Sequence, residues 1–218
     1  MRKDLITNWL AKKNLYLTEA QLNQLALYQD MVLTAPINLT AIKTNEDFAI
    51  KHFIDSFTLL EYIDKCKKNI QYIDIGTGAG FPGIPLKIAR PEIKLTLLDS
   101  LQKRILFLRR AVDALSLSDV ECVHARIEDS KVKKYDVAFC RAVARLDKLL
   151  MYAIPILNPG GVFFAMKGPD ISDEIKNAKP ILDKFGVTIE SIDKIEIAHN
   201  MKHTIIQIRK QMNTDSKG

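Results

Sequence analysis

Residues 70–83 read IQYIDIGTGAGFPG, and this stretch decides the fold. A short apolar run ends at Asp74, and glycines follow at positions 76, 78, 80 and 83. This order is typical of a buried strand that turns tightly into a helix while its backbone stays open to a ligand. The stretch therefore predicts the first strand of an α/β domain, with a binding loop directly after it.

The glycine spacing fits two patterns. Positions 78, 80 and 83 match the G-x-G-x-x-G of dinucleotide folds, and positions 76, 78 and 80 match a different nucleotide-binding turn. A pyrophosphate prefers free backbone N–H groups and no carboxylate at the start of the helix. Here Asp74 precedes the glycines, and Pro82 and Pro85 remove N–H donors. The loop therefore favours a ligand with an amino group and a sulfonium, such as S-adenosylmethionine, while the spacing alone leaves NAD or NADP open.

The length of 218 residues fits one domain that buries its hydrophobic core without disulfides. Lys and Arg outnumber Asp and Glu by 32 to 26, which favours a polyanionic partner such as RNA. The basic N-terminus has no continuous apolar stretch, and no apolar run approaches the roughly 20 residues of a membrane span, so a cytoplasmic protein without a membrane partner is expected. The three cysteines and four histidines show no metal-ligand spacing, so no metal site is predicted.

Helical signals mark residues 1–65, which we expect to form a small helical region packed on the core. Thr18 followed by Gln21 predicts a capping box, and Asn45 or Asp47 is expected to cap a later helical stretch that runs through Tyr62.

Residues 66–210 alternate short β-rich runs with helical segments, as parallel βαβ units do. Strands are expected at 70–75, 94–99, 120–124, 135–140, 161–166, 187–195 and 203–209, and helices at 82–90, 101–115, 145–157 and 172–185. No helix separates the last two strands, so they predict a closing antiparallel hairpin. The result is a doubly wound, Rossmann-like α/β sheet of seven strands, followed by a frayed tail at 211–218.

Ligands of open α/β sheets bind beyond the carboxyl ends of the strands, so the residues there are the candidates for a site. Asp99 ends the second strand, where a carboxylate accepts hydrogen bonds from ribose hydroxyls; the alternative is that it caps the following helix. Ile127 and Glu128 follow the third strand, where an adenine ring would rest. Glu128 as an ordinary solvated acid is the alternative there.

Cationic side chains follow the fourth and fifth strands. Arg141 is placed to hold a carboxylate or phosphate bidentately, with a surface ion pair as the alternative, and its replacement by Ala is expected to weaken ligand use without unfolding the protein. Arg145 and Lys167 lie at the same edge. The helix at 101–115 adds Arg104 and Arg109 on its outer face, which extends a track suited to RNA phosphates or is simply a solvated surface.

Several segments together resemble one family. They are NLTAI (38–42), KHFIDS (51–56), DIGTGAGFPGIPL (74–86), LLDSLQKRILFL (97–108), RIED (126–129), CRAVA (140–144) and MKGP (166–169). In this order they resemble the bacterial 16S ribosomal RNA guanine-N7 methyltransferases, once called glucose-inhibited division protein B. The resemblance is close from residue 31 to about 168, and it departs mildly at Ala79, where many members carry proline.

The resemblance implies the class I S-adenosylmethionine-dependent methyltransferase variant of the doubly wound fold, with S-adenosylmethionine as cofactor. It implies that Gly76, Phe81, Ile127, Glu128 and Arg141 line the cofactor site, with Asp99 at the ribose. The implied reaction is methylation of N7 of a guanosine, number 527 in the usual 16S rRNA numbering.

The expected partner is 16S rRNA or a precursor of the small ribosomal subunit, and the chain is expected to be a monomer. Attack by the free lone pair of N7 needs no general base, so no catalytic residue is assigned. Two other functions remain open from the residues alone: an NAD(P)-dependent oxidoreductase and a non-catalytic RNA-binding module.

Overall fold

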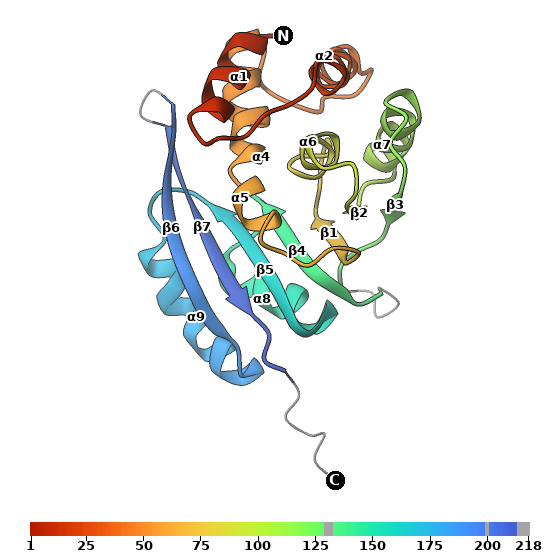
Figure 1. Cartoon of the computed structure of the whole chain (residues 1–218). Helices are drawn as coiled ribbons and strands as arrows, with labels where there is room; N and C mark the ends of the chain where they lie inside the picture. Colours follow the sequence, from red (N-terminus) through yellow and green to blue (C-terminus); the bar gives the residue numbers. More distant parts are fainter. Residues whose placement is uncertain (129–132, 199–200, 213–218) are drawn as a thin grey trace.

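The computed structural model describes residues 1–128, 133–198 and 201–212. One seven-stranded sheet runs through the molecule in the order β3-β2-β1-β4-β5-β7-β6 (Figure 1). The strands are β1 (Gln71–Ile75), β2 (Lys94–Asp99), β3 (Val120–His124), β4 (Tyr135–Arg141), β5 (Leu157–Lys167), β6 (Thr188–Ala198) and β7 (Met201–Arg209). The first five pair in parallel, and β7 runs antiparallel to both β5 and β6. The predicted doubly wound sheet and its closing hairpin are therefore confirmed.

The helices are α1 (Lys3–Ala11), α2 (Glu19–Thr34), α3 (Asn45–Phe48), the π-helix η1 (Ala49–Ile54), α4 (Asp55–Phe57), α5 (Leu60–Ile63), α6 (Gly83–Ala89), α7 (Gln102–Ala114), α8 (Leu146–Ile156) and α9 (Ser172–Phe185). The four helices with predicted ranges, α6 to α9, follow those ranges within one residue at each end, and further helices form within residues 1–65. The largest difference is in β5, which begins at Leu157 rather than at 161. The predicted tail beyond Met212 and the turn between β6 and β7 at 199–200 lie outside the described residues. No helix in the described part of the chain has the length and apolar character of a membrane span.

The sheet separates two hydrophobic cores, because neighbouring residues of a strand point to opposite faces. Tyr72 and Leu97 pack with α6 and α7 on one face, while Ile73 and Leu98 pack on the face that α8 and α9 cover (Figure 1). Both faces of the central strands are thus buried, which explains their nearly continuous apolar sequences.

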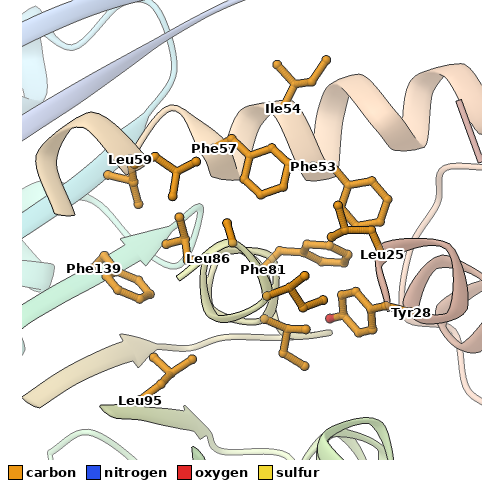
Figure 2. Close-up of a cluster of buried hydrophobic side chains, with 14 of the residues drawn as sticks. Leu25, Tyr28, Phe53, Ile54, Phe57, Leu59, Phe81, Leu86, Leu95 and Phe139 are labelled. Carbon is orange, nitrogen blue, oxygen red and sulfur yellow. The ribbon is translucent and has the colours of Figure 1, made fainter. Parts of the chain in front are cut away.

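The N-terminal helices extend the first of these cores over α6. Figure 2 shows Tyr28 from α2 and Phe53 from η1 beside Phe81, which lies just before α6. All three side chains are buried. Residues of the N-terminal helices therefore pack directly on the loop that follows β1.

Local capping explains where two of these helices begin. Thr18 and Gln21 form the predicted capping box at the start of α2. The later helix starts differently from the prediction of Asn45 or Asp47, because the Thr44 hydroxyl accepts the backbone N–H of Asp47. Asn45 instead turns its amide oxygen to Gln29 of α2, so a contact distant in sequence removes it from the cap.

Candidate functional site

The carboxyl ends of β1, β2 and β4 meet at the switch point of the sheet, where chain connections diverge in opposite directions. A cavity of about 380 Å³ opens there, and we call it the loop pocket. Its lining includes the predicted site residues Gly76, Phe81, Asp99 and Arg141. Three segments that are distant in sequence thus reach one cavity, as the strand order requires.

Positive φ angles shape the glycine loop. Gly76 and Gly78 have φ of +66° and +63°, a region that glycine enters without steric cost. A Cβ on Gly76 would meet Val143 at 2.5 Å, whereas a Cβ on Gly78 would meet nothing within 4 Å. A side chain at position 76 would therefore collide with Val143. The space beside Gly78 is empty and faces the loop pocket.

Asp99 links the second strand to this loop. One carboxylate oxygen accepts the backbone N–H of Gly78 at 2.9 Å, and the other accepts the N–H of Leu101 at 2.8 Å, just before α7. Arg104 lies 3.2 Å from the first of these oxygens. Asp99 therefore lines the loop pocket and accepts the N–H of the residue before α7, while its contact with a ribose stays a prediction.

Asp74 does not line the loop pocket, so the preference of the loop for a cationic ligand does not come from direct contact with this carboxylate. Its side chain is fully buried and accepts hydrogen bonds from Thr77 Oγ1 at 2.6 Å and from Gly83 N at 2.8 Å. Burial raises the pKa of Asp74 to about 7, against the opposing hydrogen bonds from these two groups. Its role in the structure is to tie β1 to the first turn of α6.

The His52 imidazole and the Arg141 guanidinium pack against the Phe81 ring and form one wall of the loop pocket. His52 stacks on Phe81 with centroids 4.2 Å apart and an interplanar angle of 8°, and the Arg141 guanidinium lies 5.3 Å from the same ring. Burial, together with the charge of Arg141, lowers the pKa of His52 to about 3. The imidazole is therefore neutral at physiological pH.

The hydrogen bonds fix the tautomer of this histidine. Arg141 has only donors, so its Nη2 donates to His52 Nδ1, 3.2 Å away. His52 Nε2 then carries the proton and donates to Thr40 Oγ1 at 2.8 Å. The loop at 35–44 is thereby joined to the wall of the pocket.

Asp55 and His203 hold Arg141 from the other side. Asp55 accepts from Arg141 Nη1 at 2.9 Å and from His203 Nδ1 at 2.6 Å, and only 7% of its side chain is exposed. Burial acts to raise the pKa of Asp55, but the hydrogen bond from His203 and the charge of Arg141 outweigh it and lower the pKa overall. Arg141 is therefore a fixed, half-buried partner of an ionised carboxylate, so its removal should cost stability, and weaker ligand use by a variant that still folds stays a prediction.

A second cavity, of about 630 Å³, lies beyond Arg141, and we call it the acceptor pocket. It shares His52, Arg141, Ala142 and Val143 with the loop pocket. Ala142 has φ of +54°, which is strained for a residue with a Cβ, and Val143 next to it is 44% exposed. The turn after β4 thus presents a short apolar ridge between the two cavities.

The four predicted RNA contacts lie in different settings. Arg145 and Lys167 line the acceptor pocket, where Arg145 is exposed and Lys167 is buried against Glu174, 2.6 Å away. Arg104 pairs with Asp99 at the loop pocket, and exposed Arg109 on α7 reaches the carbonyl of Cys122 at 3.4 Å.

Ile127 and Glu128 are not in the lining of the loop pocket. Ile127 is half-buried beside the core that α8 covers, and Glu128 is exposed and hydrogen-bonds Tyr152 of α8. They follow β3, the strand next to β2, and so remain on the same edge of the sheet.

Sequence reasoning missed Tyr28, His52, Asp55 and His203. Tyr28 is fully buried and donates its hydroxyl proton to the carbonyl of Ala79 in the glycine loop. His52 and Asp55 are three residues apart in KHFIDS, a spacing that places both on one side of a helix. That spacing could have indicated that His52 and Asp55 act together. The sequence around Tyr28 and His203 shows only ordinary apolar patterns.

A doubly wound sheet that ends in an antiparallel hairpin and opens a glycine-loop pocket at its switch point is the fold of the class I S-adenosylmethionine-dependent methyltransferases. Solved structures agree on the fold: TrmN from Thermus thermophilus gives a TM-score of 0.58 at 18% identity over 71% of this chain and 48% of that one. A methyltransferase from Pyrococcus furiosus gives 0.59 at 18% identity, covering 89% of this chain and 100% of the other.

Sequence comparison then gives the family. The family model of rRNA small subunit methyltransferase G, also called GidB, matches residues 21–204. Ribosomal RNA small subunit methyltransferase G of Clostridium botulinum (strain Loch Maree) is 44% identical over 94% of this chain and 88% of its own length. The protein of that name from Alkaliphilus oremlandii is 41% identical over 99% of this chain and 93% of its own. The chain therefore belongs to the rRNA small subunit methyltransferase G family.

Proposed function

We propose that this enzyme transfers the methyl group of S-adenosylmethionine to N7 of a guanosine in 16S rRNA. The observation that carries the proposal is the wall that the two pockets share, formed by His52 and residues 141–143. A cofactor in the loop pocket would bring its sulfonium to this wall, and a base in the acceptor pocket would approach from the other side. The position implied by the family resemblance is guanosine 527.

The reaction balances without an added acid or base. The N7 lone pair attacks the methyl carbon, the N–C bond forms, and the S–C electron pair stays on sulfur as a neutral thioether. The positive charge moves to the purine, and no proton is transferred. The enzyme's contribution is then alignment of the two reactants at near-attack distance, which removes several kcal/mol of barrier.

Cofactor contacts are proposed for the residues that the sequence singled out. The loop pocket would bind the cofactor through Gly76, Phe81, Asp99 and Arg141. The Asp99 carboxylate would accept hydrogen bonds from the ribose hydroxyls, and the Nε–H of Arg141 would donate to a carboxylate. Ile127 and Glu128, which follow β3, would contact the adenine. For Glu128 this requires exchange of its present hydrogen bond to Tyr152.

Cationic side chains at the two pockets and on α7 would contact the phosphates of the RNA backbone. Arg109 and Arg145 are exposed, whereas Arg104 and Lys167 are already paired with carboxylates and would contact RNA only at their remaining donors. The substrate is proposed to be 16S rRNA, free or in a small-subunit precursor, and the enzyme to act as a cytoplasmic monomer.

Binding and transfer experiments test this function together. Isothermal titration should show S-adenosylmethionine and S-adenosylhomocysteine binding and no NAD or NADP binding, and labelled methyl should appear in 16S rRNA at one guanosine. Binding of NADP alone would support the oxidoreductase alternative. RNA binding without methyl transfer to free rRNA or small subunits would support the non-catalytic module.

A further inference from the structure

We propose that Glu174 selects the target base by accepting a hydrogen bond from the exocyclic N2 amine of guanine. This inference rests on the proposed function, because it takes the acceptor pocket as the place of the methyl-accepting base. Glu174 lies on α9, which carries none of the site residues predicted from the sequence.

Two carboxylates line the acceptor pocket, Asp55 and Glu174. Both oxygens of Asp55 are occupied, one by His203 and the other by Arg141. Glu174 differs, because a single oxygen, Oε2, accepts both Leu146 N at 2.7 Å and Lys167 Nζ at 2.6 Å. Its Oε1 has no hydrogen-bond partner among the described residues.

The position of Glu174 is fixed before any substrate binds. Lys167 is buried and also donates to the carbonyl of Ala144, so its ammonium group is fixed and holds the Glu174 carboxylate in place. The N–H of Leu146 belongs to the first turn of α8, which adds a second anchor. A half-buried carboxylate held in this way loses little side-chain freedom when a donor reaches its open oxygen.

Guanine is the base that suits an acceptor at this place. Its N2 amine is a donor that adenine and hypoxanthine lack, and it lies on the side of the purine opposite N7. With N7 at the wall shared with the loop pocket, the amine points away from that wall. Glu174 lines the same pocket, and its open oxygen would accept a hydrogen bond from this amine while the sulfonium faces N7.

The test uses full-length enzyme, labelled S-adenosylmethionine, and small subunits reconstituted with 16S rRNA that carries guanosine, inosine or 7-deazaguanosine at the target position. We expect wild-type kcat/KM to be about 10- to 100-fold lower for inosine than for guanosine, because a hydrogen bond to a charged group is lost. Glu174→Gln should lower the guanosine value by about the same factor and bring the two substrates within about 3-fold of each other. Asp173→Asn is the matched control: it removes one exposed carboxylate from the same helical turn and should keep the wild-type ratio.

Each outcome has a separate meaning. Equal wild-type rates on guanosine and inosine would overturn the role of Glu174 and leave N7 methylation standing. An equal loss on both substrates in Glu174→Gln would also overturn it, since that pattern belongs to a merely structural residue. Methylation of the 7-deazaguanosine substrate would instead overturn the proposed function.

Discussion

Replacing Arg141 by Ala should reduce stability as well as cofactor binding. The side chains of Arg141 and Asp55 are only 19% and 7% exposed, and their atoms approach to 2.9 Å. Removing one member of a buried ion pair typically costs about 3–5 kcal/mol, because the other charge stays buried without compensation. Asp55 keeps its 2.6 Å bond to His203, so we expect a loss nearer to about 2–4 kcal/mol.

A double-mutant cycle separates this effect from loss of packing. Urea unfolding without cofactor would compare wild type, Arg141→Ala, Asp55→Asn and the double variant. Because position 55 is neutral in the Asp55→Asn background, removing Arg141 there leaves no buried carboxylate without its partner, and the Arg141 replacement should cost about 1–3 kcal/mol less. Arg110→Ala, which removes an exposed arginine of α7, serves as the control and should change stability by less than about 0.5 kcal/mol.

One result would refute the reasoning. If Arg141→Ala cost less than about 1 kcal/mol, and equally in both backgrounds, the buried pair would contribute nothing and Arg141 would be an ordinary surface cation. Titration of the folded variant with S-adenosylmethionine then measures the binding role separately. Unchanged affinity there would remove Arg141 from the cofactor site.

Other contacts of the loop and of α7 can be tested in the same way. Tyr28→Phe leaves the carbonyl of Ala79 without its buried donor, so it should cost about 1–3 kcal/mol in urea unfolding and weaken S-adenosylmethionine binding; a neutral result in both would separate α2 from the loop. Asp74 has a folded-state pKa of about 7, above its unfolded value, so its stabilising contribution is full below about pH 4 and falls as pH rises to about 7. Unfolding from pH 4 to 8 should therefore show wild type losing up to about 4 kcal/mol relative to Asp74→Asn, and parallel curves would argue against the raised pKa. RNA affinity should fall steeply with salt, and Arg109→Ala should make that dependence shallower; an unchanged slope would leave this face of α7 without phosphate contacts.

The fold was predictable because its signals are local. The apolar runs that became β1 and β2 are bounded by charged residues or glycine, and helical spacing fills the segments between the strands. The capping box at Thr18 depends on a residue only three positions away. Such patterns act within one turn or one strand, so the sequence carries them directly.

The acceptor side of the site depends on contacts that no local pattern contains. Asp55 and His203 are 148 positions apart and meet only because β7 inserts between β5 and β6. The π-helical stretch that carries His52 has ordinary helix-forming residues, and its hydrogen-bond pattern follows from packing. Arg141 could be placed at a strand end from the sequence, but its burial against Asp55 could not.

The charge states around Arg141 fit a reaction that moves no proton. His52, with its pKa near 3, is neutral, and Asp55, with its pKa lowered, is ionised. Each accepts a hydrogen bond from Arg141, and the other oxygen of Asp55 accepts one from His203, so neither group is free to take a proton from a substrate. An enzyme that needed a general base would instead hold such a group near neutral pKa and leave one of its atoms free. Titratable side chains in this wall therefore hold Arg141 in place between the two pockets, which agrees with a reaction that depends on the alignment of its reactants and not on proton transfer.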